Sequence, residues 1–147
     1  MATPFKFEIH TLYRLFFSDM VESITLTLAD GDIGVYANHS FFTAPVLSCI
    51  LRVKDESGVR LVFITDGILE VKGHGTVLMV DAAEWPDEID VERARAAMEE
   101  AERDIAEATL PFELESAKAR LRRAQFRLKA HELKGNAKTV ATVDADI

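Results

Sequence analysis

TVLMVDAAEWPDEIDVERA, residues 76–94, is the stretch in which the pattern of the chain changes and which decides the fold. It begins with five apolar or β-branched residues, as is typical of a strand. From Ile89 onward, small and apolar residues recur every three or four positions, as is typical of a helix. The sequence therefore predicts two parts: an all-β domain, residues 1–84, and a helical segment, residues 85–133.

The residues before this boundary form short runs in which apolar and polar side chains alternate. Phe5, Phe7 and Ile9 alternate with polar neighbours, and residues 20–28 repeat the pattern. Turn signals rich in Gly and Asp separate the runs, at residues 29–32, 54–58, 66–67 and 73–75. No helical interval of about 10–15 residues lies between the runs, so a parallel sheet with crossover helices is not expected. The pattern predicts an N-terminal all-β sandwich.

Two stripes of small and apolar residues predict two helices after the boundary. The first stripe contains Ala94, Ala97, Ala101, Ile105 and Ala108, and the second contains Leu114, Ala117, Leu121, Ala124, Leu128 and His131. Pro111 lies between the stripes, where it ends one helix and starts another. Asp87 or Asp90 can cap the first helix. Because the connection is short, the sequence predicts a C-terminal antiparallel α-helical hairpin from about residue 89 to residue 133.

The two stripes are rich in alanine, which lets helices approach closely but buries little apolar area. A hairpin of this size is also below the usual length for independent folding. We therefore expect a hairpin of modest stability that can detach from the sandwich or extend. The last residues, 134–147, carry no helical stripe and are expected to form a flexible tail.

The composition limits what the chain can bind directly. It has 147 residues and a net charge of −8, which argues against nonspecific binding to nucleic acid or anionic membranes. No run reaches the ~18 apolar residues of a membrane span, and residues 1–6 lack the pattern of a signal peptide. Any membrane link is therefore expected to run through a partner. Cys49 is the one cysteine of the sequence, so we expect a buried thiol and a reducing compartment.

The sequence offers no arrangement that is typical of a catalytic site. Cys49 lies beside no obvious base, and Gly73-His74-Gly75 precedes a strand, so it predicts a turn and not a phosphate loop. The histidines lack paired metal-ligand spacing; they are His10, His39, His74 and His131. We therefore expect no metal site. A folded barrel could still gather three of them, which leaves a metal-dependent β-barrel enzyme as an alternative.

Charge divides the two predicted helices. Residues 89–108 carry 3 basic and 7 acidic side chains, whereas residues 112–133 carry 6 basic and 3 acidic ones. Most of these charges are interpreted as pairs between the helices or as solvated side chains. Arg120, Arg123 and Arg127 share one helix face, however, and arginines on one face can bind phosphate through forked hydrogen bonds. The hairpin is therefore a candidate nucleotide- or phosphate-binding element.

Four segments are similar to the motifs of one known family. They are GDIGVY (31–36) with Asn38 and His39 behind it, ITDGILEV (64–71), VLMVDAAE (77–84) and IDVERA (89–94). They occur in the family's order and cover about residues 5–133, over the predicted sandwich and hairpin. Together they resemble the epsilon subunit of the bacterial F-type ATP synthase.

The resemblance implies a rotary role and no catalysis by the chain itself. In this family the sandwich lies at the foot of the central stalk, against the gamma subunit and the membrane rotor ring, at the cytoplasmic face of the inner membrane. The hairpin lies on the sandwich, or extends along gamma into the alpha/beta catalytic head and blocks ATP hydrolysis. By position, Asp30, Gly31, Asp32 and His39 match the region near the ring. The coupling ion, proton or sodium, stays open, and a free-standing sandwich-and-coil adaptor is the alternative.

The resemblance also implies a regulatory ATP site on the compact hairpin, as in some bacterial members. The residues that match it by position are Glu84, Ile89, Asp90, Arg93, Ala94, Arg123 and Arg127. Residues 37–41 depart from the family's Pro-Gly-His-Ala-Pro loop, and Glu100 stands where ATP-binding members carry an arginine. A carboxylate in place of that arginine should cost about 1–3 kcal/mol of phosphate binding. We therefore expect no required cofactor, and ATP that binds weakly or not at all.

Overall fold

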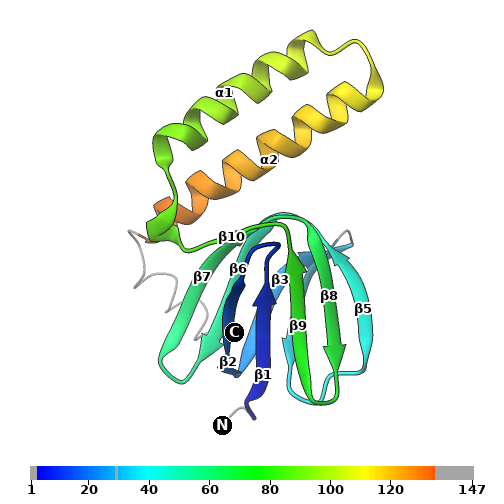
Figure 1. Ribbon diagram of the computed structural model, residues 1–147, viewed down its shortest axis with the longest axis vertical. Coiled ribbons are helices and arrows are strands. Elements are labelled where there is room, and N and C mark those ends of the chain that lie inside the picture. The colour runs from blue at the N-terminus through cyan, green and yellow to red at the C-terminus, as the bar shows by residue number, and fades with distance from the viewer. Residues whose placement is uncertain (1–2, 29, 135–147) are drawn as a thin grey trace.

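The computed structural model describes residues 3–28 and 30–134. Strands form a β-sandwich, and two antiparallel helices form a hairpin at one end of it (Figure 1). The predicted fold class, a β-sandwich followed by a helical hairpin, is therefore confirmed. Lys134, which is predicted to belong to the tail, is the last residue of the second helix. The rest of the predicted tail, residues 135–147, lies outside the described part of the chain.

Ten strands occur in the described residues and join into one continuous sheet that folds over itself. They are β1 (Phe5–His10), β2 (Leu15–Val21), β3 (Ser23–Leu28), β4 (Gly31–Tyr36), β5 (Phe42–Val46), β6 (Cys49–Asp55), β7 (Gly58–Ile64), β8 (Gly67–Lys72), β9 (Gly75–Val80) and β10 (Ala83–Glu84). The strand order is β10-β7-β6-β3-β5-β8-β9-β1-β2, with β4 paired to β3. β1 and β9 are parallel, and the other pairs are antiparallel.

The core of the sandwich follows from the alternation in the sequence. In β1, Phe7 and Ile9 are fully buried, while Glu8 between them is half-buried and Lys6 before them is exposed. β3 repeats the arrangement with Ile24 and Leu26. Because successive side chains of a strand point to opposite faces, each alternating run places one set inside. Each fully buried side chain of this kind contributes about 2 kcal/mol by leaving water.

The hairpin begins after a short 3₁₀ turn, η1 (Pro86–Glu88). Helix α1 (Val91–Glu107) is capped by Asp90, whose Oδ1 accepts a hydrogen bond from the backbone N–H of Arg93 at 3.1 Å. Helix α2 (Pro111–Lys134) starts at Pro111. Proline has no N–H to donate, so it fits a first turn, where no acceptor is available inside the helix. The predicted cap at Asp90 and the predicted break at Pro111 are both confirmed.

The predicted alanine stripes form the contact between the helices. Four of their members are buried: Ala94 and Ala101 of α1, and Ala117 and Ala124 of α2. At the end of α2 the prediction is wrong, because His131 is exposed and Ala130 is buried in its place. The last turns of α2 contact the sandwich and η1, where Ala130 is buried with Phe63 and Lys134 pairs with Asp87. The buried face of the helix therefore shifts by one residue.

The hairpin meets the sandwich mainly through the C-terminal half of α2 (Figure 1). Ala130 of α2 is buried with Phe63 of β7 and Ile89 of the linker, and Ile50 and Phe126 pack against them. We call these five residues the docking cluster. A contact made by one half of one helix is small, so the position of the hairpin depends on a few side chains.

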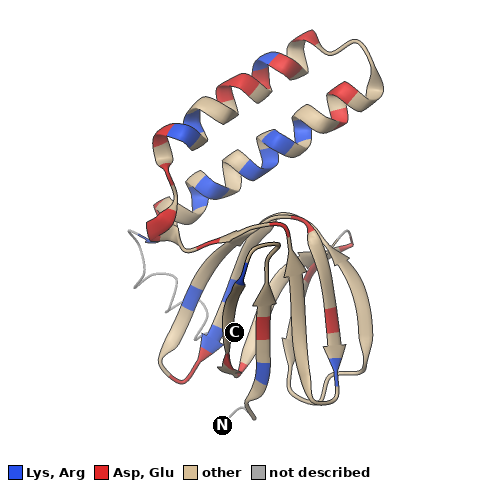
Figure 2. Ribbon diagram, viewed as in Figure 1, with Lys and Arg blue, Asp and Glu red and all other residues tan. Residues whose placement is uncertain are grey.

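Charges on the two helices complement each other along their length. Acidic side chains predominate on α1 and basic ones on α2 (Figure 2). Arg120 of α2 donates to Oδ2 of Asp104 of α1 at 2.9 Å. The interpretation that charges pair between the helices is thus confirmed for Arg120, and this arginine is not available to the face it shares with Arg123 and Arg127.

Candidate functional site

A pocket of about 460 Å³ opens where β10, the linker and both helices meet. Its lining residues are Glu84, Glu88, Asp90, Arg93, Ala94, Ala97 and Arg127. Five of the seven residues that match an ATP site by resemblance are among them: Glu84, Asp90, Arg93, Ala94 and Arg127. We call this space the hairpin pocket. Closure of the hairpin completes it, since Arg127 of α2 joins a lining that otherwise comes from residues 84–97.

Two of the seven predicted residues are placed differently. Ile89 is buried in the docking cluster beneath α2, so its side chain supports the linker rather than lining the hairpin pocket. Arg123 is half-buried and is not among the lining residues. It lies one helical turn before Arg127, and this turn of α2 is farther from the linker that forms the pocket's floor. The structure therefore brings Asp90, the cap of α1, together with Arg127 of α2, but not with Arg123.

Arg127 is the basic residue that α2 contributes to the hairpin pocket, and it already has partners. Its Nε lies 2.6 Å from Oε1 of Glu84. Its guanidinium also lies over the ring of Phe63, at 4.6 Å from the centroid. An incoming phosphate would have to compete with Glu84 for Arg127, because one guanidinium edge is already taken.

The charges around the hairpin pocket do not favour an anion. Three carboxylates line it, from Glu84, Glu88 and Asp90, against the two guanidiniums of Arg93 and Arg127. Asp90 accepts from the first turn of α1, and Glu88 accepts from the backbone N–H of Trp85 at 3.2 Å. Glu100 is exposed on α1, about one turn beyond the lining residue Ala97. A nucleotide phosphate extending along α1 would meet this fourth carboxylate.

The four residues that the resemblance assigns to the rotor-ring region do not form one site. Asp30, Gly31 and Asp32 lie at the start of β4, whereas His39 follows its end. A six-residue strand separates them, about 20 Å at 3.3 Å per residue. Asp32 accepts from Oγ1 of Thr27 at 2.5 Å and lines a pocket beneath α2. The His39 ring lies tilted against Phe42, with the ring centroids 5.1 Å apart. One set therefore faces the hairpin end of the sandwich, and His39 lies at the opposite end.

The face of α2 that contacts the sandwich was not singled out from the sequence. Arg122, Phe126 and Ala130 are four positions apart and lie on this face. Nε of Arg122 donates to the backbone O of Ser48 at 3.0 Å, and Phe126 and Ala130 belong to the docking cluster. The signal that could have found them is a second stripe with helical spacing, Phe126 and Ala130. The charged Arg122 at its start hides this stripe from a search for apolar residues.

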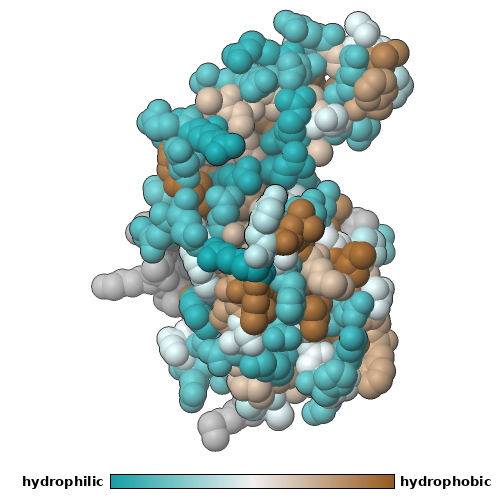
Figure 3. Space-filling view, viewed as in Figure 1, coloured by the Kyte–Doolittle hydropathy of each residue, from teal (hydrophilic) through white to brown (hydrophobic). Residues whose placement is uncertain are grey.

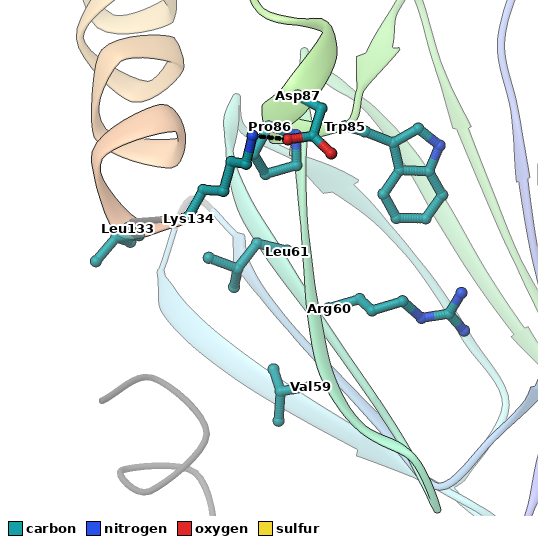
Figure 4. Close-up of a pocket in the computed structure, with 8 residues that line it drawn as sticks. All are labelled: Val59, Arg60, Leu61, Trp85, Pro86, Asp87, Leu133 and Lys134. Atoms are coloured by element: carbon teal, nitrogen blue, oxygen red, sulfur yellow. Dashed lines mark ion pairs between the residues drawn. The ribbon is translucent and has the colours of Figure 1, made fainter. Parts of the chain in front are cut away.

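A second pocket, of about 240 Å³, lies where the end of α2 meets the edge of the sheet (Figure 4). Leu61 of β7 and Leu133 of α2 line it, together with Trp85. Lys134 at the end of α2 forms an ion pair with Asp87 of η1. This pair ties the last turn of the hairpin to the segment in which the hairpin begins.

A row of exposed apolar side chains crosses the outer face of the sheet. Ile68 of β8 pairs with Met79 of β9, Met79 with His10 of β1, and His10 with Leu15 of β2. Ile68, Met79 and Leu15 are 46%, 40% and 51% exposed. Apolar groups are visible on this face of the sandwich in Figure 3. Exposed apolar side chains on one face of a sheet can form part of a surface that another protein covers. We call these three residues the apolar row.

The described residues contain no group of three or more His, Cys, Asp or Glu side chains that could hold a metal ion. His10 instead lies 3.5 Å from Glu8, and His131 lies 3.5 Å from the backbone O of Pro86. The described residues therefore supply no set of metal ligands for the alternative of a metal-dependent β-barrel enzyme. Neither helix in this part of the chain is long and apolar enough to cross a membrane.

Comparison with known proteins supplies two family matches and a set of relatives. The family described as the beta-sandwich domain of the ATP synthase Delta/Epsilon chain matches residues 4–86, and the long alpha-helix domain of the same chain matches residues 87–132. The ATP synthase epsilon chain of Caldicellulosiruptor bescii is 41% identical over 128 residues, covering 87% of this chain and 93% of that one. The epsilon chain of Caldanaerobacter subterraneus is 38% identical over 130 residues, covering 88% and 94%.

Solved structures share the fold. A chain in the Euglena gracilis mitochondrial ATP synthase, OSCP/F1/c-ring, matches with a TM-score of 0.66 at 20% identity, covering 93% of this chain and 82% of that one. A chain in the central stalk and c-ring of the Tetrahymena thermophila mitochondrial enzyme matches with a TM-score of 0.64 at 15% identity, covering 88% and 98%. At these identities the likeness concerns the arrangement of sandwich and helices.

Proposed function

Because the chain belongs to the ATP synthase delta/epsilon family, we propose that it is a central-stalk subunit of an F-type ATP synthase. In this role the sandwich joins the gamma subunit to the membrane rotor ring, and the hairpin limits ATP hydrolysis. The subunit supplies no catalytic residue of its own. It is a peripheral component at the cytoplasmic face of the inner membrane, held there by its partners.

The apolar row is the observation that carries the anchoring role. Leu15, Met79 and Ile68 come from three strands of a sheet whose inner face is fully packed, so these side chains do nothing for the core. Their exposure costs solubility unless another protein covers them. We assign this face to gamma, which contacts the sandwich in the family. Asp30 and Asp32 at one end of the sandwich and His39 at the other are the candidates for polar contacts with the ring or with gamma.

The regulatory role rests on how little holds the hairpin. Its contact with the sandwich centres on the docking cluster, and its helices meet through alanines. A hairpin held by this cluster and a few polar contacts can leave the sandwich without unfolding it. Once extended, the basic side of α2 would face an acidic surface in the catalytic head and oppose rotation in the hydrolysis direction. A ligand shifts this balance only by its different affinity for the two positions.

ATP is at most a weak regulator in this proposal. The hairpin pocket has the size and several of the residues for a nucleotide, but Arg127 is paired with Glu84 and carboxylates predominate. The chain's own side chains therefore hold the hairpin in its compact position without a nucleotide. Regulation then depends on the position of the hairpin more than on the concentration of ATP.

Co-purification with gamma tests the anchoring role. We expect the full chain to retain gamma and Met79→Glu to release it, because a charge in the centre of the apolar row would be buried without a partner. Ser57→Glu, in the turn before β7, introduces the same charge away from the row and should retain gamma. If the wild-type chain fails to bind gamma, the free-standing adaptor becomes the better account.

An ATPase assay on the assembled enzyme tests the regulatory role. Removing residues 86–147 should leave gamma binding intact, since the apolar row remains, and should raise the rate of ATP hydrolysis. Unchanged hydrolysis in an enzyme that still contains the shortened subunit would argue against inhibition by the hairpin.

A further inference from the structure

Arg122 connects the middle of α2 to a turn of the sandwich 74 positions earlier in the chain. Its Nε donates a hydrogen bond to the backbone O of Ser48, at 3.0 Å. Ser48 lies between β5 and β6. This contact stands outside the hairpin pocket, whose lining includes Arg127 but not Arg122.

The acceptor of this bond is held by contacts within the sandwich itself. Ser48 is 1% exposed, and Oδ1 of Asp66 accepts from both its backbone N–H at 2.7 Å and its hydroxyl at 2.8 Å. The preceding residue, Leu47, donates its backbone N–H to the O of Thr27 at 3.0 Å. Because these bonds hold the turn in place, its carbonyl needs no rearrangement to accept from Arg122.

The donor is held as well. The guanidinium of Arg122 lies over the ring of Phe126, one turn further along α2, at 5.0 Å from the centroid. Phe126 in turn belongs to the docking cluster. The long side chain of Arg122 is therefore ordered along its own helix, so less conformational entropy is lost when it bonds to Ser48.

Arg122 and Arg127 hold α2 from two sides. Five positions separate them, which is about 140° around the helix and about 7.5 Å along it. Arg127 bonds to Glu84 on the linker side, and Arg122 bonds to Ser48 on the side of β6. The apolar docking cluster lies between the two contacts. Two polar contacts on different faces fix the rotation of a helix, which an apolar patch alone leaves free.

We infer that Arg122 is a positioning residue that sets the compact position of the hairpin independently of the hairpin pocket. A charged donor to a buried, fixed carbonyl contributes more than an ordinary surface contact. Loss of Arg122 therefore shifts the hairpin away from the sandwich even though every residue of the hairpin pocket remains. The inference concerns the chain by itself and goes beyond its proposed place in a larger assembly.

The test measures a distance in the free, full-length chain. Spin labels at Ser57→Cys in the sandwich and Thr109→Cys at the tip of the hairpin, in a Cys49→Ala background, report the separation by pulsed electron resonance. Arg122→Ala should raise the ratio of lifted to compact hairpins about tenfold, as expected for loss of a charged hydrogen bond. Arg122→Lys keeps the charge but not the planar guanidinium, and should give an intermediate ratio.

Arg103→Ala is the matched control, since it removes the same charge from an exposed position on α1. It should leave the distance distribution of the wild type unchanged. A distribution for Arg122→Ala that matches the wild type would overturn the inference, as would an equal shift in Arg103→Ala. Circular dichroism identifies a variant that has unfolded; if Arg122→Ala unfolds, the folded Arg122→Lys decides, and an unshifted distribution in it counts against the inference. Because no partner is present, failure of gamma binding cannot produce either result.

Discussion

Nε of Arg127 lies 2.6 Å from Oε1 of Glu84, so a single ion pair joins the last strand of the sandwich to the second helix of the hairpin. The two side chains are 29% and 26% exposed. Phe63 covers one face of the guanidinium. Partial shielding from water makes this pair stronger than a typical surface pair. Both side chains line the hairpin pocket, so the pair occupies part of it.

This pair should show a measurable coupling energy. In a double-mutant cycle with Glu84→Gln and Arg127→Met, we expect a coupling of about 1 kcal/mol in the free energy of unfolding. Urea denaturation followed by circular dichroism provides the four values. The exposed pair Glu115–Lys118 serves as the control and should show little coupling. Additive effects of the two substitutions would mean that the 2.6 Å contact is screened in solution.

Reversing the charge at Glu100 should strengthen nucleotide binding. Calorimetric titration of the isolated wild-type chain with ATP is expected to give weak binding or none. Glu100→Arg should raise the affinity about tenfold or more, because it replaces repulsion of the phosphates by attraction. Glu99→Arg makes the same change at the neighbouring, exposed position and should have a smaller effect. Micromolar affinity in the wild type, abolished by Arg127→Ala, would contradict this reasoning.

Gly67 is a position at which even one methyl group is too large. A Cβ placed there would lie 2.0 Å from the backbone O of Met79 and 2.6 Å from Cγ1 of Val80. Gly67→Ala must therefore push β8 and β9 apart, and we expect a loss of about 3 kcal/mol in the free energy of unfolding. Gly34→Ala is the control, because its nearest contact is the side chain of Tyr36 at 3.3 Å, which can move. Equal thermal stability of the two variants would contradict the prediction.

Cys49 should make the stability of the chain depend on alkaline pH. Burial raises the pKa of its thiol above the usual 9.0, against smaller lowering effects of Thr27 and the positive charge of Arg122. The folded state thus holds the thiol proton more tightly than the unfolded state does. The stabilisation from Cys49 is complete below pH 9 and is lost as the pH rises from there towards the folded pKa. The stability advantage of the wild type over Cys49→Ala should therefore shrink above pH 9 in urea titrations; a constant difference would contradict it.

The spacing of apolar and polar residues was sufficient to predict strands and helices whose formation depends on neighbouring residues. The alternation around Phe7 and Ile9 predicted a strand, and Asp90 and Pro111 predicted where the two helices start. β5 gives a weaker signal, because Pro45 interrupts it. The structure shows why proline is tolerated there: β5 pairs along its length with β8, but with β3 at a single position, which resembles an edge strand.

The sequence by itself determined that a sandwich precedes a hairpin, because periods of two and of about 3.6 are properties of neighbouring residues. It also brought five residues of the hairpin pocket into consideration, through their resemblance to a family. Only the tertiary structure decided that Glu84 pairs with Arg127 and that Arg122 bonds to Ser48. It also decided that Ala130, and not His131, is buried at the end of α2. These contacts join residues 43 and 74 positions apart and depend on how α2 crosses the sheet. That crossing is fixed by packing of whole elements, which no local pattern encodes.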